Sequence, residues 1–458
     1  MPYQYTIPQK QLQGAKQWAT PTSFRPHSAR PGEGEIPLVQ PGTIGYNGGN
    51  KSTELRKPYV DCNYRRRCLR HGGGTGGGGT SRGPGGAAGA SGPAGAQAPG
   101  NGRCNLTNLH ALQGGYHGED PGFPKYALGC FPPEETLDWF RKMGLYTVAE
   151  ASGRVYPYSD QANSVVDVLR FALEKPNIRV ELGCEVERVK KTAAGFRVEW
   201  PEGSLDCHRL IVACGGLAGT KLGGSMSGYK LLRSLGHRCT RLRPTLVQVK
   251  TGWGGVVSLK GVRANCHAQI LHNGAPVRQS VGELQFTEWG LSGPVMFELS
   301  RDVCQEKGSW VCRMDFLPDM DRETLLEELR RRRETRLPAT ELFTGILHNR
   351  LGRVLTQAAG ISPGSPIAAL DDGQLAEAAR LAKGLDAALT EPLGMDSAQV
   401  TAGGIVTAEF DSATMESRLV SGLYVCGEVL DVDGDCGGYN LQWAWSSGRL
   451  AGSSAGKE

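Results

Sequence analysis

Glycine is concentrated in one stretch of this chain, and that stretch limits what the N-terminal part can fold into. Residues 72–100 read GGGTGGGGTSRGPGGAAGASGPAGAQAPG, with no apolar side chain larger than alanine. Such a segment buries too little surface to offset its ordering entropy. Residues 1–56 are also rich in Pro, Gln and Gly and show no sustained periodicity. We therefore expect residues 1–100 to be irregular and disordered, and residues 101–458 to hold the folded part.

Composition narrows the class of protein. The chain has 458 residues and a formal net charge of +5, which is small for this size and argues against a dedicated nucleic-acid binder. It contains no apolar run of about 18 residues and no apolar signal-peptide core after its start. Its 13 cysteines form no CxxC pair, which is typical of reduced thiols. We expect a cytoplasmic protein with no membrane partner, and composition excludes a disulfide scaffold and a zinc ribbon.

Beyond residue 101 the pattern alternates between strands and helices. Helical spacing of apolar residues covers 164–175, 228–237 and 321–335, and more helix is expected through 383. Strands are expected over 177–200 and 209–216, and 253–302 is strand-rich with turns at 272–274 and 292–294. The segment 422–452 returns to strand, turn and helix. This order indicates an α/β fold with a middle insertion.

The first motif with chemical potential is GNGRCNLTN, residues 100–108. Its two glycines favour a tight turn with exposed backbone N–H groups. Asn105, Thr107 and Asn108 then place several amide and hydroxyl groups in a short span. An Asn-rich capped turn before a helix explains the same residues equally well.

Two further motifs put glycines at the ends of apolar strands. IVACGG, residues 211–216, is a buried strand that runs into paired glycines, where α/β proteins bind cofactors. In YVCGEVLDVDGDCGGYN, a strand ends at Gly427, and Gly437–Gly438 opens a helix whose N-terminus favours an anionic group. His237 and His267 have no partner at metal-ligand spacing, so we expect both to be structural and expect no metal site. Arg331–Arg333 fits a solvated helix face.

Taken in order, these motifs resemble the BaiN-type flavoproteins, an aminoacetone-oxidase-like family of NAD(P)/FAD-dependent oxidoreductases. The resemblance extends over GRVYPYSDQANSVVDVL, SGYKLLRSLGH, GELQFTEWGLSGP and VTAGGIVTAEFDSATMESRLVSGLYVCGEVL. It implies a Rossmann-like FAD-binding domain built from residues 101–240 and 401–458. It also implies an inserted β-rich and helical domain over residues 241–400. The expected activity is FAD-dependent oxidoreduction of an unidentified small molecule, with NAD(P)H as a candidate reductant.

The resemblance also implies which residues contact FAD. The helix start lies near the flavin N1–C2=O edge, the turn after the last strand lies by the ribityl–pyrophosphate portion, and the GNGRC motif lines the isoalloxazine. A backbone contact to adenine is expected from the strand after Cys184. No catalytic acid or base is recognisable. The expected cofactor-binding residues are Arg103, Cys104, Asn105, Thr107, Asn108, Val186, Cys214, Gly215, Gly216, Gly427, Glu428, Gly437, Gly438, Tyr439 and Asn440.

The chain departs from the family pattern in three places. LAGTKLGG, residues 217–224, stands where members carry an aromatic–Pro turn, and Glu288 stands where they carry His. The dinucleotide fingerprint GxGxxG is missing, and residues 61–100 occupy its place. The first strand and helix of the FAD-binding domain are therefore lost or displaced in reading frame.

A displaced reading frame explains this gap. One codon choice for DCNYRRRCLRH, residues 61–71, encodes IVIIGGGASGM when its first base is dropped. That string is a buried strand followed by a phosphate-binding turn, the context that the fingerprint requires. Two alternatives stay open: a non-catalytic remnant that has lost FAD binding, and an RNA-associated protein that uses a genuine Arg/Gly-rich arm.

Overall fold

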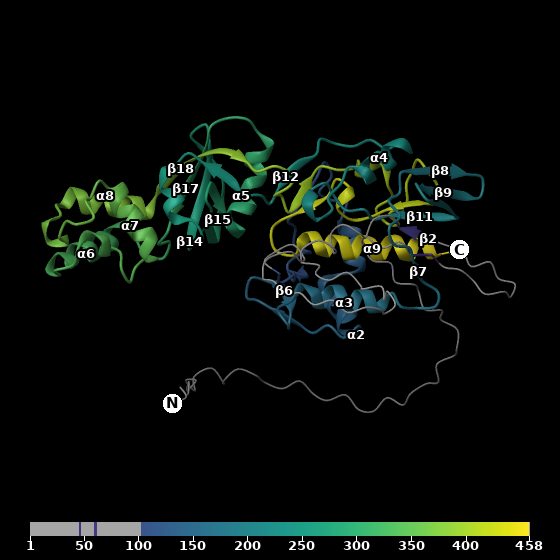
Figure 1. Ribbon diagram of the computed structural model, residues 1–458, viewed down its shortest axis with the longest axis horizontal. Coiled ribbons are helices and arrows are strands. Elements are labelled where there is room, and N and C mark those ends of the chain that lie inside the picture. The colour runs from purple at the N-terminus through teal and green to yellow at the C-terminus, as the bar shows by residue number, and fades with distance from the viewer. Residues whose placement is uncertain (1–44, 47–58, 62–101, 458) are drawn as a thin grey trace, which may run out of the picture. The chain divides into compact units, whose positions relative to one another are not determined.

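The computed structural model describes residues 45–46, 59–61 and 102–457 (Figure 1). All of these lie in one compact unit, residues 37–458. The expectation of an irregular segment over residues 1–100 falls outside the described residues, except at two short strands. These are β1 (Gly45–Tyr46) and β2 (Tyr59–Asp61), and the expectation of a mostly irregular segment stays a prediction. Pairing with β7 and β11 supplies hydrogen bonds that local composition did not predict.

A parallel sheet of three described strands forms the centre of the fold. Its order is β2, β11 (Arg209–Val212), β20 (Leu423–Val425), so β11 lies between the other two. The runs LIV and LYV are buried, as expected for parallel strands covered on both faces. β2 ends at Asp61, the first residue of the string that the displaced frame would encode, four residues before its fingerprint. The start of a first Rossmann strand is therefore present beside β11.

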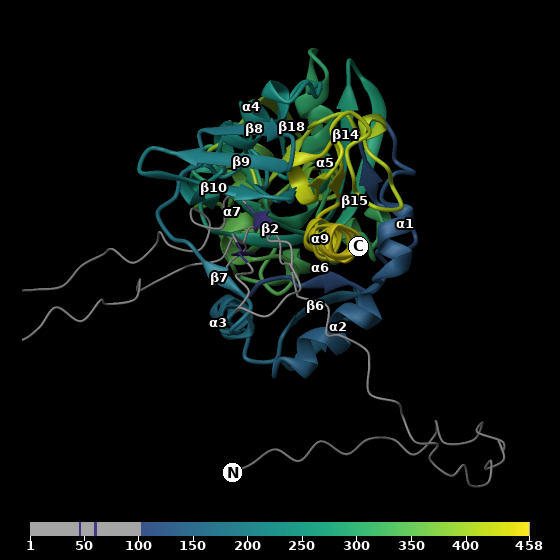
Figure 2. The ribbon, with the colours of Figure 1, turned by 90° about the vertical axis from the view of Figure 1, so that its right-hand side faces the viewer.

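Helix α9 (Tyr439–Gly456) packs beside this sheet and against α1 (Lys125–Cys130) (Figure 2). Smaller sheets surround it, in the orders β3–β6–β5, β10–β9–β8, β21–β4 and β1–β7. The remaining elements outside the insertion are β3 (Thr107–Asn108), β4 (Tyr116–His117), α2 (Pro133–Lys142), β5 (Thr147–Ala149), β6 (Arg154–Pro157), α3 (Ala162–Ala172), β7 (Arg179–Val180), β8 (Arg188–Thr192), β9 (Gly195–Trp200), β10 (Gly203–Cys207), α4 (Ser227–Ser234) and β21 (Asp433–Gly434).

The insertion begins and ends on one pair of antiparallel strands, β12 (Arg243–Thr245) and β19 (Val400–Ala402). Between them a closed barrel has the order β13–β16–β15–β14–β17–β18. Its strands and the helices around it share one large apolar core. These elements are β13 (Val249–Thr251), β14 (Arg263–His272), β15 (Ala275–Phe286), β16 (Gly290–Ser292), α5 (Gly293–Gln305), β17 (Trp310–Asp315), α6 (Arg322–Arg331), α7 (Asn349–Ala358), α8 (Asp372–Lys383) and β18 (Leu385–Pro392).

The prediction that 253–302 is strand-rich throughout is wrong at its end. Helix α5 starts at Gly293, which has φ +88°, and Pro294 lies in its first turn. The Gly-Pro pair that we interpreted as a turn is a helix start, where proline is favoured because it has no N–H to satisfy. The capped-turn alternative for residues 100–108 is also wrong about the following helix, since Thr107–Asn108 forms strand β3.

Other expectations can be checked on the described residues. Within that part of the chain no helix combines the length and apolarity needed to cross a membrane. Among the described cysteines, the free thiols include Cys130, Cys207, Cys239, Cys266, Cys304, Cys312 and Cys436. In the same range no three His, Cys, Asp or Glu side chains gather as metal ligands would.

His237 is buried and structural, as expected. Its Nδ1 lies 2.9 Å from Glu409 Oε2, and its Nε2 lies 3.0 Å from Ser417 Oγ. This arrangement has the residue types of a hydrolase triad. However, Ser417 is 6% exposed, and its oxygen accepts the N–H groups of Leu419 and Val420. The hydroxyl therefore caps a turn and is not available as a nucleophile.

Candidate functional site

The N-terminus of α9 is shaped by three glycines and one asparagine. Gly437 and Gly438 have φ of +119° and +101°, a region that favours glycine. Asn440 fixes the loop before them: its Oδ1 accepts the Gly434 N–H and its Nδ2 donates to the Gly434 carbonyl, each at 2.8 Å. The first-turn N–H groups of such a helix have no intrahelical acceptor, so they favour an anionic group.

Residues 105–108 of the GNGRCNLTN motif dock on this helix start. Asn108 Nδ2 donates to the Gly437 carbonyl at 2.8 Å, and the Thr107 hydroxyl donates to the Gln442 side-chain oxygen. A Cβ on Gly438 would lie 2.4 Å from the Thr107 carbonyl carbon and oxygen. Asn105 Oδ1 is buried without a hydrogen-bond partner among the described residues. Two motifs from opposite ends of the folded chain therefore form one surface.

Arg103 and Cys104 are held differently from their neighbours. The Arg103 guanidinium pairs with Asp160 and with Glu150 at 3.3 Å, and it lies 4.0 Å from the centre of the Tyr156 ring. Cys104 is buried in a small apolar core with Phe140 and Trp445. The charge of Arg103 is thus already compensated by two carboxylates.

Gly215 and Gly427 follow the carboxyl ends of the adjacent strands β11 and β20. Their φ values are +70° and +77°, and a Cβ built on either would meet nothing within 4 Å. Gly216, by contrast, packs tightly, because a Cβ there would lie 2.1 Å from Glu428 Oε1. That oxygen accepts the Thr401 N–H at 2.9 Å. The chain is closely packed behind these turns and open in front of Gly215 and Gly427.

Helix α9 links the two glycine-rich regions. The Gly427 N–H donates to Ser447 Oγ at 3.0 Å, and its carbonyl accepts the Trp443 indole N–H at 3.1 Å. Trp443 lies five residues beyond Gly438, which is roughly 7.5 Å along a helix axis at 1.5 Å per residue. The two regions therefore lie along one helix, within a few turns of each other.

Two of the expected residues lie in the core. Val186 is 3% exposed and is buried with the apolar residues around β11. The Cys214 side chain lies against Gly228 of α4, where a Cβ would be 2.0 Å from the sulfur. Cys104 is also buried in an apolar core and Arg103 pairs with Asp160 and Glu150, whereas the other expected residues lie in the two regions described above.

These residues fit an extended dinucleotide. Open space in front of Gly215 and Gly427 lies at the carboxyl ends of parallel strands, where α/β folds bind such ligands. The start of α9 offers N–H groups for an anionic edge. The turn after β2, which would hold the pyrophosphate, is outside the described residues.

Sequence reasoning missed a cluster of titratable groups beside Gly437. Arg154 of β6 lies so close that a Cβ on Gly437 would be 2.8 Å from its Nε. Glu298 of the inserted helix α5 reaches the same place, with Oε1 4.0 Å from Arg154 Nη2. Cys436 and Tyr439 flank the glycine pair, and both interact electrostatically with Arg154 and Glu298.

Three groups of this cluster favour their protonated forms. Burial raises the pKa of Glu298, although Ser280 and Arg154 partly oppose it. Burial raises the pKa of the Cys436 thiol to about 11. Burial, together with the charges of Asp435 and Glu298, also raises the pKa of Tyr439. The cluster therefore places proton-bearing side chains around one guanidinium.

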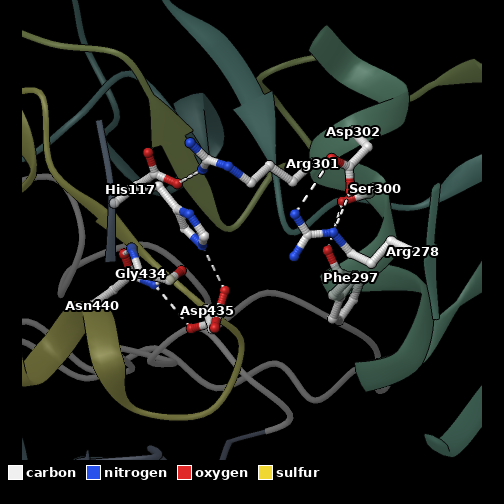
Figure 3. Close-up of polar contacts among 10 residues, drawn as sticks. His117, Arg278, Phe297, Ser300, Arg301, Asp302, Gly434, Asp435 and Asn440 are labelled. Atoms are coloured by element: carbon white, nitrogen blue, oxygen red, sulfur yellow. Dashed lines mark hydrogen bonds and ion pairs between the residues drawn. The ribbon is translucent and has the colours of Figure 1, made fainter. Parts of the chain in front are cut away.

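A second charged group joins the insertion to the same loop. Arg301 of α5 reaches the segment that carries Gly434 and Asp435, where it pairs with Asp433 (Figure 3). Asp433 is 1% exposed, its Oδ1 has no hydrogen-bond partner among the described residues, and burial raises its pKa. His117 Nε2 lies 2.7 Å from Asp435 Oδ1. The spacing DVDGD, residues 431–435, was the signal that could have indicated this face, because alternate residues of extended chain share one side.

The family model described as the HI0933-like protein Rossmann domain matches residues 96–454. The chain belongs to this family. Its members are FAD-dependent oxidoreductases, and this agrees with the resemblance inferred from the motifs. The Rossmann-type α/β architecture is confirmed as well.

Two curated relatives are similar to this chain over most of its length. One is the 3-dehydro-bile acid delta(4,6)-reductase of Clostridium scindens, 38% identical over 361 residues, which cover 78% of this chain and 88% of the relative. The other is the ribosomal RNA dihydrouridine synthase of Escherichia coli K12, 34% identical over 353 residues, covering 76% and 85%. Among solved structures, the open conformation of a flavocytochrome c3 fumarate reductase is similar at a TM-score of 0.37 and 14% identity, covering 76% of this chain and 66% of that one.

Proposed function

We propose that this chain is an FAD-dependent reductase of a small molecule in which a carbon–carbon double bond is conjugated to a carbonyl. The two curated relatives differ in substrate, but their names describe related chemistry. A 3-oxo delta(4,6) steroid and the uracil base both hold a double bond conjugated to a carbonyl. A reductase of such bonds needs a hydride source on one side and a proton source nearby.

The observation that carries this proposal is the set of proton-bearing groups beside Gly437 and Gly438. Glu298, Cys436 and Tyr439 have raised pKa values at the start of α9, where the flavin edge is expected. Groups whose pKa is raised by burial suit a site that delivers a proton during reduction. The N-terminus of α9 suits a negatively charged ring edge, because its free N–H groups stabilise negative charge.

FAD, when bound, would supply hydride transfer. The chain's own residues would do the rest. Gly215 and Gly427 leave space for the extended cofactor, and Gly438 lets the GNGRC segment approach the helix start. Thr107 and Asn108 fix that approach through their hydrogen bonds. That all these residues contact one FAD molecule stays a prediction.

Retention of FAD during purification tests whether the protein is an FAD enzyme. In this fold the pyrophosphate is held at the N-terminus of the first helix, which must pack on the first strand. Residues 61–100 as given contain too many glycines for that helix, at a cost of about 1 kcal/mol each relative to alanine. The chain with this sequence should bind FAD poorly. A version in which residues 61–71 are replaced by IVIIGGGASGM and the following codons are read in the same frame should be yellow after desalting. Stoichiometric FAD on the chain as given would contradict this.

Substrate reduction tests the proposed reaction. The frame-restored, FAD-loaded protein should reduce a 3-oxo-delta(4) steroid with NADH or NADPH as the reductant, followed as loss of enone absorbance. A uridine-containing ribosomal RNA fragment provides a second arm, read by mass for dihydrouridine. Reduction of neither substrate class by the FAD-loaded protein would overturn the proposed function and favour a non-catalytic member of the family.

A further inference from the structure

Arg154 lies directly against the glycine pair that opens helix α9. It lies on strand β6, and Arg154 pairs in register with Asn108 of β3. Asn108 in turn holds the Gly437 carbonyl, and Gly437 has no Cβ that would collide with the guanidinium. The guanidinium is therefore fixed directly against the glycine pair that opens the helix. Its side chain keeps 23% exposure, so a ligand can reach it.

The charge of Arg154 is weakly compensated. Its ion pair is with Glu298 at 4.0 Å, the outer limit of such a contact. Glu298 also accepts a hydrogen bond from the Ser280 hydroxyl, which engages one face of its carboxyl group. The other arginines on this side have closer partners: Arg301 pairs with Asp433, and Arg278 pairs with Asp302. A partly exposed guanidinium with five N–H donors and no closer carboxylate among the described residues is a binding site for a carbonyl or anionic oxygen.

We propose that Arg154 binds the carbonyl oxygen of the substrate and stabilises the negative charge that this oxygen gains during reduction. This assignment rests on the proposed function. Hydride, supplied by the reduced cofactor, adds to the carbon β to the carbonyl, and the displaced π electrons move to the oxygen as an enolate. A proton from one of the proton-bearing groups beside Gly437, Cys436 or Tyr439, then reaches the α carbon and restores the carbonyl, and solvent reprotonates that group. NAD(P)H is the two-electron reductant that returns the cofactor to its reduced form.

The inserted domain shares in this site because it supplies Glu298. The 4.0 Å separation between Glu298 and Arg154 leaves the guanidinium donors free to pair with the enolate oxygen. An ionised Glu298 would compete with that oxygen. We therefore assign Glu298 as a positioning residue for Arg154, and we expect substrates without a carbonyl conjugated to the double bond to be excluded.

Binding of para-nitrophenol tests the assignment without turnover, because its phenolate imitates an enolate oxygen. With the full-length protein, at a pH near the pKa of free para-nitrophenol, we expect binding to increase phenolate absorbance. The R154Q variant should bind the phenolate at least tenfold more weakly, and R154K should keep part of the affinity. The R278Q variant, in which a nearby arginine with its own carboxylate is changed, should bind like the wild type. Urea unfolding confirms that each variant is folded.

Turnover of the FAD-loaded protein separates this inference from the proposed function. R154Q should lower kcat on an enone by about 100-fold, the loss typical of removing one oxyanion-stabilising donor. Equal phenolate binding or equal kcat in R154Q and wild type would overturn the role of Arg154 and leave the proposed function standing. Phenolate binding that depends on Arg154 in a protein that reduces no enone would support the oxyanion site and overturn the proposed function alone.

Discussion

Replacing Arg301 by methionine should leave a buried carboxylate without its partner. The side chains of Arg301 and Asp433 are 13% and 1% exposed, and their ion pair joins helix α5 of the insertion to the loop before α9. Asp433 Oδ1 already lacks a hydrogen-bond partner among the described residues, so little else compensates its charge. Methionine keeps most of the length of the arginine stem and removes the charge.

We expect R301M to lower the free energy of unfolding by about 3 kcal/mol. Breaking a buried ion pair by removing one partner costs about 3–5 kcal/mol, and the residual exposure of Arg301 points to the lower end. Removing both charges is far less costly, because a well-packed apolar pair replaces the desolvated ions. The double variant R301M/D433L should therefore lie within about 1.5 kcal/mol of the wild type.

The loss of unfolding free energy in R301M should be larger at high pH than at low pH. Burial raises the pKa of Asp433, and Arg301 is the group that most opposes that rise. Without Arg301 the folded-state pKa rises further above the unfolded value of about 3.9. A group with a raised folded-state pKa contributes stability below the unfolded pKa and loses it as pH rises through the folded pKa. R301M should therefore approach the wild type as pH falls from 8 to 5.

Urea unfolding at pH 5 and pH 8 measures these differences, provided that the slope with denaturant is unchanged. Equal losses in R301M and in the double variant would show that packing of the arginine stem, not its charge, matters. A loss in R301M that is the same at both pH values would refute the assignment of Asp433 as the group left uncompensated.

Three further predictions concern other sites. Gly438→Ala should lower the free energy of unfolding by about 2–5 kcal/mol, because of strain at φ +101° and a collision with Thr107. Gly215→Ala has open space for the methyl group, so it should lose only the backbone strain of about 1–2 kcal/mol. Equal losses of the two variants in urea unfolding would contradict this. Ser417→Ala should lower stability by about 1–3 kcal/mol because His237 loses its hydroxyl partner, while the exposed Ser421→Ala should be neutral in the same assay. Iodoacetamide should label Cys436 slowly at pH 7 and faster toward pH 11, with Cys436→Ser as the mass-spectrometry control; a rate independent of pH would count against burial of that thiol.

The central strands and α9 could be predicted because their signals are local. Strands β11 and β20 are short apolar runs that end in glycine, and α9 starts directly after a glycine pair. The contact between the GNGRC segment and α9 followed only from the family resemblance, since no local pattern relates Asn108 to Gly437. Sequence patterns report periodicity within one element, and they carry no direct signal for contacts between distant elements.

The charged cluster could not be predicted for the same reason. Arg154 and Glu298 lie 144 residues apart in the sequence, and their contact depends on how helix α5 packs against the α9 loop. Helix α5, which carries Glu298, was itself missed because Gly-Pro is typical of turns as well as of helix starts. The alternating aspartates of residues 431–435 were visible in the sequence, but their partners were not.

Strands β12 and β19 have an evolutionary consequence. Thr245 and Val400 are opposite each other in antiparallel register, so the chain leaves the host fold and returns to it at neighbouring positions. Opposite residues of such strands lie about 5 Å apart, a gap that a two-residue hairpin turn can close. A gene segment encoding residues 246–399 could therefore be exchanged for another without shifting the register of the host strands. Each exchange would replace Glu298 and Arg301 while keeping Arg154 and the α9 glycines, and the new segment would have to supply a partner for the buried Asp433.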